Sequence, residues 1–184
     1  MERFRDLREG DSPIYTDSFK RWFGDWENDP KSSSKIVGED GKPLVVYHNT
    51  DSEFTSFDRD MIMGDCLGDG FYFSDAPHKV FGSNTMRCYL NVRNPYVVEN
   101  LNSVDCICEL FKAMGEDVGD EVDGWYDYYI MDCRKNGTSV GKSIISKLLE
   151  DHGILMSESL ADYGYDGVIY FNTIGGIKDK VKIG

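Results

Sequence analysis

Two short apolar segments, each preceded by a glycine-containing turn, constrain the fold of this chain most strongly. Leu44 to Tyr47 follows the turn sequence Glu39-Asp40-Gly41-Lys42-Pro43, which predicts a buried strand with His48 where the strand leaves the core. The second segment runs from Gly68 to Ser74 and places Tyr72 in the middle of a strand. Because side chains alternate along a strand, Tyr72 is expected on the face opposite Phe71 and Phe73. The core is therefore predicted to include short strands.

His48 and Tyr72 have the chemistry to bind a ligand that carries hydroxyl groups and a flat ring. A histidine presents one ring nitrogen to a ligand hydroxyl while a backbone carbonyl holds the other and fixes the tautomer. A tyrosine ring stacks on a heteroaromatic group, and Gly68 and Gly70 let the backbone approach a flat ligand. Singly, each residue also fits a structural role, as a hydrogen-bonded histidine, a core tyrosine or a turn glycine. Their order along the chain favours a ligand site.

These ordered motifs resemble the ADP-ribosyltransferases of the His-Tyr-Glu group, which includes diphtheria toxin and the poly(ADP-ribose) polymerases. The chain is most similar to the ADP-ribosyltransferase domains of phage head-morphogenesis proteins and of phage or mobile-element polyvalent proteins. The resemblance covers nearly the whole chain except the stretch from about Val104 to Glu150. The segments that carry it are Phe19–Trp26, Ser34–Val37, Asp40–His48, Phe54, Phe57–Asp58, Gly70–Phe73, Tyr89–Pro95 and Gly164–Ile169.

The resemblance implies an α+β fold with a split β-sheet core and flanking short helices. Residues 1–184 would form one domain, with a helical lead-in over residues 1–34. NAD is the implied substrate, and no metal is expected. His48 would hydrogen-bond the ribose on the adenosine side, Tyr72 would stack on the nicotinamide ring, and the Asn49 backbone would meet the carboxamide. Thr50, Gly70 and Ser74 complete the predicted NAD-binding set.

The chain departs from the family pattern at two positions. Asn49 stands where the family usually has glycine, so a side chain there would crowd the nicotinamide. The family also carries a glutamate on a late strand, which binds the nicotinamide ribose and helps to activate the acceptor, but no glutamate follows Glu158 here. Asp179 is the only late acid beyond the turn residue Asp166, so it is the one candidate for that role. The sequence indicates either a chain cut before its catalytic strand or a variant with little transferase activity.

Composition excludes some classes of function. At 184 residues and 40% apolar content, the chain is long enough for one core of good size. A net charge of −13 disfavours direct nucleic-acid binding, which needs a basic face. It fits an ordinary soluble surface or, less simply, DNA mimicry against a host enzyme. The five cysteines are irregularly spaced, which predicts free thiols in the reducing host-cell cytosol. No secretion signal or membrane span is recognised.

In the first half of the chain, the remaining patterns predict short elements. Thr16 or Asp17 caps a helix with a core stripe formed by Phe19, Trp22, Phe23 and Trp26. Residues 59–69 form a polar loop that could fold over bound NAD. Ser74 and Asp75 are expected to cap a short helix that carries His78 and Phe81. Arg87 to Val92 is a predicted strand, and Asn94-Pro95 turns it into the strand Tyr96 to Val98.

Helices dominate the predictions for the second half. Ser103 caps a helix that ends at Gly115, and the acid-rich stretch Glu116 to Asp127 is a solvated loop without the ligand spacing of a calcium site. Gly137 to Ser143 has too few residues between its glycines for a phosphate loop, so it starts a helix that ends near Gly153. A further helix runs from Ser157 to Gly164. Val168 to Phe171 is a buried strand.

Two functional hypotheses follow. The first is an NAD-dependent mono-ADP-ribosyltransferase of phage or mobile-element origin that modifies a macromolecular acceptor such as a host or phage protein, with no membrane partner. The second is a non-catalytic module that keeps the fold to bind NAD, ADP-ribose or a protein. Fold-level analogy carries much of either hypothesis, and one fold hosts many functions.

Overall fold

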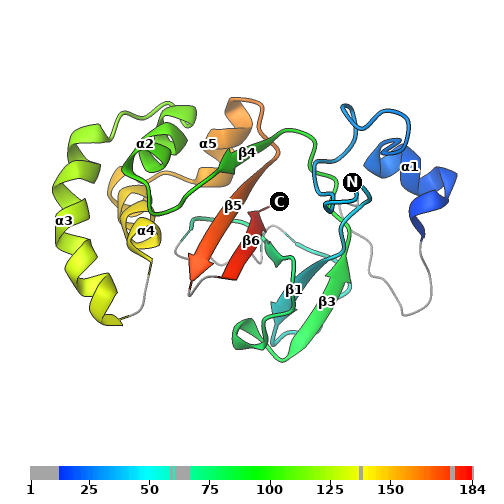
Figure 1. Cartoon of the computed structure of the whole chain (residues 1–184), viewed down its shortest axis with the longest axis horizontal. Helices are drawn as coiled ribbons and strands as arrows, with labels where there is room; N and C mark the ends of the chain where they lie inside the picture. The colour runs from blue at the N-terminus through cyan, green and yellow to red at the C-terminus, as the bar shows by residue number, and fades with distance from the viewer. Residues whose placement is uncertain (1–12, 59, 61–66, 137–138, 175–176, 184) are drawn as a thin grey trace.

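The structure is a computed structural model that describes residues 13–58, 60, 67–136, 139–174 and 177–183, with only the backbone described at 132, 134–136, 172–174 and 177–183. The strands are β1 (Val46–Thr50), β2 (Tyr72–Ser74), β3 (Asn84–Cys88), β4 (Pro95–Val98), β5 (Gly167–Ile174) and β6 (Ile177–Ile183). The α-helices are α1 (Asp17–Phe23), α2 (Val104–Ala113), α3 (Gly119–Asn136), α4 (Val140–His152) and α5 (Met156–Asp162). Two short 3-10 helices are η1 (Pro13–Tyr15) and η3 (Lys79–Phe81). Figure 1 shows the sheet between α1 at one end and α2, α3 and α4 at the other.

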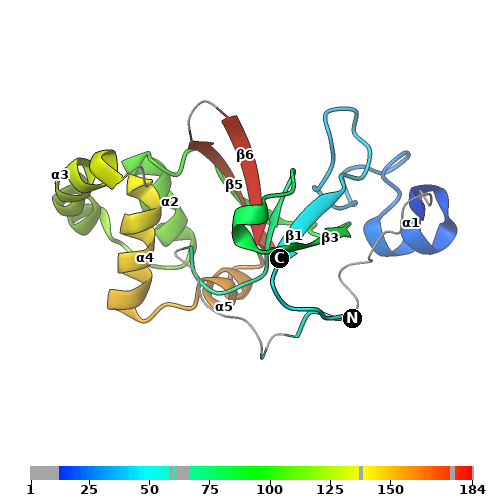
Figure 2. The ribbon, with the colours of Figure 1, turned by 90° about the horizontal axis from the view of Figure 1, so that it is seen from below.

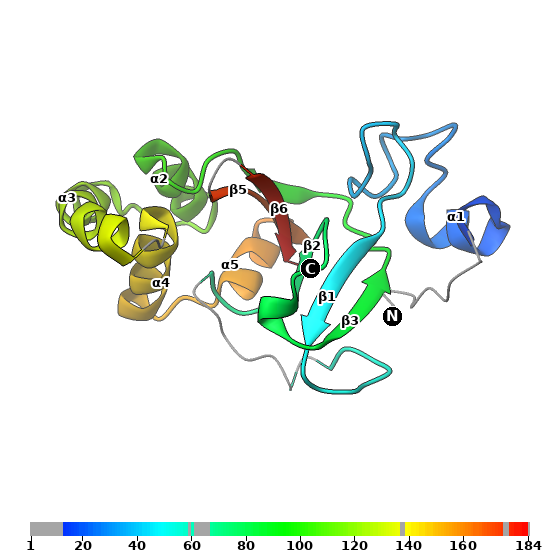
Figure 3. The ribbon, with the colours of Figure 1, turned by 60° about the horizontal axis from the view of Figure 1, so that its bottom comes forward.

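The strands form a six-stranded sheet in the order β3-β1-β2-β6-β5-β4. Neighbouring strands are antiparallel except β4 and β5, which are parallel. The two halves of the sheet, β3-β1-β2 and β6-β5-β4, meet where Tyr72–Ser74 pairs with residues 181–183. Figure 3 shows these halves splayed apart, with β6 beside β2. Together with the flanking helices, this architecture confirms the predicted α+β class.

The two faces of the sheet bury different clusters. Val168 and Tyr170 of β5 pack with the buried faces of α2, α4 and α5, whereas Ile169 between them packs with Val46, Phe73 and Cys88 on the other side. This alternation is what the extended backbone imposes on successive side chains. Figure 2 shows α2, α3 and α4 grouped at the β5 and β6 end of the molecule, so the helical cluster covers one half of the sheet.

The N-terminal helix forms as its pattern predicts. The Thr16 hydroxyl accepts a hydrogen bond from the Phe19 amide and caps α1. Phe19, Phe23 and Trp26 are buried together with Tyr89, so the aromatic stripe is core. The loop after α1 is fixed to the sheet by Ser34, whose hydroxyl donates to the Leu90 carbonyl at 2.7 Å and accepts from the Val92 amide.

The helices of the second half are mostly confirmed. Ser103 caps α2 and Ser139 caps α4; each hydroxyl accepts a hydrogen bond from the backbone amide three residues later. Gly153 ends α4 in the left-handed conformation. Gly141 lies inside α4, where a Cβ would fall 1.4 Å from the Leu101 carbonyl oxygen. Gly141 therefore allows α4 to pack closely against the segment before α2. Because Gly141 lies inside a helix, the structure agrees with the prediction that this segment is not a phosphate loop.

The acid-rich stretch was predicted as a loop, and this prediction is wrong. Residues from Gly119 onward form α3, because Val122 at its start and Val118 just before it are fully buried and Trp125, Tyr126 and Tyr129 pack on the same cluster. An apolar side chain every three or four residues is enough to hold a helix against a core. Asp120 and Glu121 also lie in the first turn, where the helix dipole favours negative charge.

Two predicted strand boundaries are also wrong, one strand was not predicted, and one predicted helix cap is absent. β1 continues to Thr50, so His48 lies inside the strand opposite Met86 and not at its end. β3 comes three residues earlier than expected, because β1 pairs with Asn84 to Cys88. Ile177–Ile183 forms β6, a strand that the sequence did not indicate. After β2, Ser74 caps no helix; His78 precedes the short η3 without a side-chain cap.

Candidate functional site

His48 is held by the main chain of the neighbouring strand. Its Nδ1 lies 2.8 Å from the Tyr72 carbonyl oxygen, so Nδ1 carries the proton and donates it. The other nitrogen, Nε2, is then an acceptor. This is the arrangement that the sequence predicts, with a backbone carbonyl that defines the tautomer.

The surroundings of His48 keep its ring neutral. The imidazole is half-buried and touches three aromatic rings, with centroid distances of 5.0 Å to Phe57, 5.5 Å to Phe73 and 5.8 Å to Phe54. Burial lowers the pKa of His48 below 6.5, partly opposed by the hydrogen bond to the Tyr72 carbonyl. At neutral pH, His48 is therefore an uncharged hydrogen-bond acceptor fixed in one orientation. Phe54 and Phe57 were noted in the sequence only as part of the resemblance.

Tyr72 lies on the opposite face of the sheet. Its ring packs against the helical cluster, whereas Phe71 and Phe73 pack in the cluster that contains Val46, as strand alternation predicts. The Tyr72 hydroxyl donates to the Gly68 carbonyl at 2.6 Å. The structure thus connects His48 and Tyr72 through the backbone carbonyl of Tyr72, while their side chains leave the sheet on opposite faces.

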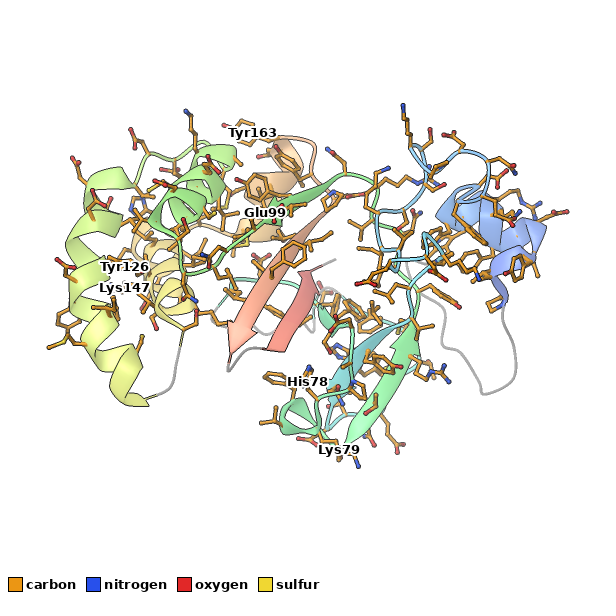
Figure 4. The ribbon with its side chains drawn as sticks, in the orientation of Figure 1. His78, Lys79, Glu99, Tyr126, Lys147 and Tyr163 are labelled. Carbon is orange, nitrogen blue, oxygen red and sulfur yellow. The ribbon has the colours of Figure 1, made fainter. Side chains whose placement is uncertain are left out.

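The side chain of Asn49 is committed to two hydrogen bonds. Its Nδ2 donates to the Thr85 hydroxyl on β3 at 2.8 Å, and its Oδ1 accepts from the His78 amide at 2.9 Å. Asn49 has no positive φ, so it occupies an ordinary strand position. It therefore ties the turn that carries His78 and Lys79, both visible in Figure 4, to β1. The expected contact between the Asn49 backbone and a carboxamide remains a prediction.

The other predicted ligand residues frame the same strands. The Thr50 hydroxyl accepts from the Ser52 amide at 3.1 Å, and a Cβ on Gly82 would meet the Thr50 backbone at 2.3 Å, so this glycine permits a close approach of η3 to β1. Ser74 pairs with Tyr47 and donates to the Ala76 carbonyl at 2.5 Å. Gly70 is buried with a φ of 149°, which side chains disfavour.

Asp69 is a structural residue of this region that sequence reasoning missed. Its carboxylate accepts hydrogen bonds from the Ser157 amide, at 3.1 Å, and from the Ser157 hydroxyl. It thereby caps the first turn of α5 from the loop that leads into β2. The position of Asp69 between two glycines could have indicated a special role in the sequence. Its partner Ser157 could not be predicted from local sequence, because it lies 88 residues away.

The residues between Arg59 and Asp69 were predicted to cover NAD; 59 and 61–66 lie outside the described residues, and Leu67 is buried in the helical cluster.

The late acids have separate positions. Asp166 lies just before β5, and its carboxylate accepts hydrogen bonds from the Arg93 amide at 2.7 Å and the Asn94 amide at 2.8 Å, so it holds this segment to the start of β4. The backbone of Asp179 lies opposite Asn172 in the β5–β6 ladder, two residues before the one that pairs with Ser74. Glu158 lies in the first turn of α5.

Two findings bear on metals and membranes. Within the described part of the chain, no three His, Cys, Asp or Glu side chains are grouped so that they could hold a metal ion. Over the same residues, no helix has the length and apolar character to cross a bilayer.

Comparison with known families agrees with this architecture. The sequence model of the family described as ADP-ribosyltransferase in polyvalent proteins matches residues 38–181, which include all six strands except the end of β6. No curated protein and no solved structure matches the chain. Because the family match spans well over half of the sequence, the chain belongs to the ADP-ribosyltransferase domains found in polyvalent proteins.

Proposed function

We propose that this domain uses NAD as a substrate for mono-ADP-ribosylation of a macromolecular acceptor, most simply a host or phage protein. The observation that supports this most is the hydrogen bond from His48 Nδ1 to the Tyr72 carbonyl. It prepares a neutral imidazole whose Nε2 accepts a hydrogen bond from a ribose hydroxyl of NAD. Family membership supports the same class of reaction.

In the proposed reaction, the bond between C1′ of the nicotinamide ribose and the nicotinamide nitrogen breaks. Nicotinamide leaves with the bonding electrons, and a nucleophile of the acceptor forms the new bond to C1′ as it loses a proton. His48 fixes the adenosine-side ribose. Stacking of Tyr72 on the nicotinamide would require its ring to leave the helical cluster on the opposite face of the sheet, so the proposal relies on His48. Asn49, Thr50, Gly70 and Ser74 belong to the strands and turns that would line the dinucleotide.

Asp179 is the proposed acid. A carboxylate near C1′ stabilises the positive charge that develops on the sugar in the transition state. Asp179 is the only acid of β6, and this strand pairs directly with β2. An aspartate reaches less far than the family's glutamate by one methylene, so Asp179→Glu is expected to retain or raise nicotinamide release, whereas Asp179→Asn abolishes it.

Calorimetric titration of NAD tests the binding part of the proposal. In His48→Asn, the amide nitrogen keeps the hydrogen bond to the Tyr72 carbonyl but the ligand-facing nitrogen is lost. We expect about tenfold weaker NAD binding, the effect of one lost hydrogen bond. The matched control is His152→Asn on α4, where His152 contacts Glu121 and not the candidate site. Equal affinity of the parent and His48→Asn would contradict the proposed role of His48.

A second candidate function is a non-catalytic NAD or ADP-ribose reader. It is favoured by the absence of a glutamate from β6, the strand that pairs with β2. Nicotinamide release, followed by chromatography with and without a protein mixture as acceptor, separates the two functions. Release that depends on Asp179 supports the transferase, and NAD binding without release supports the reader.

A further inference from the structure

The outward surface of α3 has a composition that folding does not require. We call the outer face of α3 the set of exposed residues Asp120, Asp123, Gly124, Asp127, Tyr128 and Met131. Their spacing of three and four residues brings them onto one side of the helix. Tyr128 is 74% exposed and Met131 is 73% exposed, which is high for large apolar side chains. Tyr128 and Met131 are three residues apart on the helix, so they are neighbours on its surface, and neighbouring exposed apolar side chains are a feature of interaction surfaces.

The opposite side of α3 makes the contacts that hold the helix in place. Val122 is fully buried, Tyr126 donates to the Asn102 carbonyl at 3.1 Å, and Lys147 lies 5.4 Å from the centre of the Trp125 ring. Figure 4 shows Tyr126 and Lys147 between α3 and α4, and Figure 1 places α3 at the edge of the molecule. The outer face is therefore available to a partner without any change in the fold.

The outer face carries three aspartates, Asp120, Asp123 and Asp127. Two neighbouring acids contact His152, whose ring nitrogens lie 3.8 Å from the Glu116 carboxylate and 3.1 Å from the Glu121 carboxylate. None of Asp120, Asp123 and Asp127 has an ion pair with the side chains that the structure describes. The helix dipole accounts for Asp120 in the first turn, but Asp127 lies beyond the reach of that effect. The pKa of the nearby Cys108 thiol is raised by burial and then by Asp123, Asp105 and Asp117, which indicates a negative potential over α2 and α3.

Gly124 leaves an open position in the middle of this face. A Cβ built there would have no heavy atom within 4 Å, so packing does not explain the glycine. Glycine inside a helix is unfavourable relative to alanine. Helical spacing surrounds the open position with Asp120, Asp127 and Tyr128, and Asp123 precedes it. The arrangement has room for a long side chain with a cationic end.

We propose that the outer face of α3 docks a lysine- or arginine-rich segment of the acceptor protein. The proposal rests on the proposed transferase function and names the class of its substrate. A basic side chain crosses Gly124, its aliphatic stem packs on Tyr128 and Met131, and its charge lies among the three aspartates. Charge complementarity selects this partner, since a second copy of the chain would bring a net charge of −13 to the same surface.

The test measures binding of a fluorescein-labelled peptide of lysine and arginine by anisotropy, with a glutamate peptide as the charge control. No NAD is present, so the result does not depend on catalysis. We expect Asp120→Asn/Asp123→Asn/Asp127→Asn to weaken binding about tenfold at low salt, because exposed charge pairs add small and salt-sensitive contributions. The matched control is Glu39→Gln/Glu53→Gln/Glu99→Gln, which removes as much negative charge from exposed positions on other elements.

Gly124→Leu gives an independent test of the same face. The substitution fills open space and favours the helix, so the thermal midpoint should rise while peptide affinity falls several-fold. Equal weakening by the control triple variant would reduce the effect to net charge and overturn the proposal. Lack of peptide binding by the parent would also overturn it, as would sedimentation showing that the face instead pairs two copies. His48→Asn should bind the peptide like the parent, so failure of the NAD site remains distinguishable.

Discussion

At the scale of single residues, the hydrogen bond of His48 depends on a main-chain atom. Replacing Tyr72 removes a ring and a hydroxyl but leaves the carbonyl that orients the imidazole. Variants at position 72 therefore report on the tyrosine alone, and variants at position 48 report on the imidazole alone. This separability follows from the fact that the two side chains lie on opposite faces of the sheet.

The buried imidazole predicts a pH dependence of stability. The pKa of His48 is lowered in the folded chain, so below about pH 6.5 the unfolded chain binds a proton that the folded chain refuses. The free energy of unfolding should fall as pH drops below that value and stay constant above it, as far as this group is concerned. Urea denaturation of the parent and of His48→Gln between pH 5 and 8 measures how the free energy of unfolding changes with pH in each protein. This range spans the ordinary histidine pKa of about 6.5. An identical pH profile in both proteins would contradict the neutral, buried state.

Asn49 gives a second prediction at this scale. Asn49→Ala removes the hydrogen bonds to Thr85 and to the His78 amide, which should cost about 1–2 kcal/mol of unfolding free energy. Asn49→Asp keeps an acceptor for His78 and should cost less. Hydrogen exchange at the His78 amide is the measurement, with Thr85→Val as the control that removes only the other bond. Unchanged exchange in Asn49→Ala would show that the turn is held by something else.

Residue-level predictions from the sequence succeeded where the chemistry is local. The alternation of Tyr72 follows from strand geometry. A backbone carbonyl was expected to hold His48, but its source, Tyr72, lies 24 residues away and was not predicted. The two bonds of Asn49 and the partner of Asp69 were not predicted either, because Thr85 and Ser157 are distant in sequence. The roles of His48 and Tyr72 toward NAD, and of Asp179, stay predictions.

At the scale of elements, caps and periodicity identified α1, α2, α4 and α5, whose signals lie within a few residues of one another. α3 was missed because its acids suggest a loop, while its helical state depends on Val122 and Trp125 meeting other helices. β3 was shifted because its register is set by β1, which a single segment does not reveal. Pairing across the chain is the information that local patterns lack.

Gly124 provides the prediction for α3. Gly124→Ala should raise the free energy of unfolding by about 0.5–1 kcal/mol, since the position is helical and a Cβ there meets no neighbour. The urea midpoint measures this gain. Gly141→Ala is the contrasting variant and should be strongly destabilised, because its Cβ would collide with the Leu101 carbonyl. A loss of stability in Gly124→Ala would mean that the helix is strained at this point.

The loop before β2 gives a further prediction. Asp69→Ala should cost about 1–2 kcal/mol, because it leaves the Ser157 amide at the start of α5 without its cap. Circular dichroism with urea denaturation measures the loss. Asp162→Ala at the other end of α5 should have little effect, and equal losses in the two variants would contradict a specific role for Asp69.

At the scale of the whole molecule, the charge of −13 predicts that salt stabilises the fold. Screening weakens repulsion among acids that are closer together in the folded chain than in the unfolded one. The urea midpoint should rise with sodium chloride, and less so in Asp120→Asn/Asp123→Asn/Asp127→Asn. A midpoint that falls with salt would show that ion pairs, such as Lys147 with Asp151, outweigh the repulsion.

The overall class was predictable from ordered motifs, since the family resemblance and the α+β pattern agree. The strand order was not. Placing β6 between β2 and β5 requires knowing that residues 177–183 pair with strands on both sides, one of them more than a hundred residues earlier in sequence.

That strand order has a consequence for synthesis on the ribosome. β6 is the last of the six strands to be translated, and until it emerges β2 has one unpaired edge and β5 lacks its antiparallel neighbour. Exposed strand edges of this kind favour association with other chains. The strands that carry His48 and Tyr72 can pair with each other and with β3 early, but the strand that carries Asp179 joins them only once translation has passed residue 183.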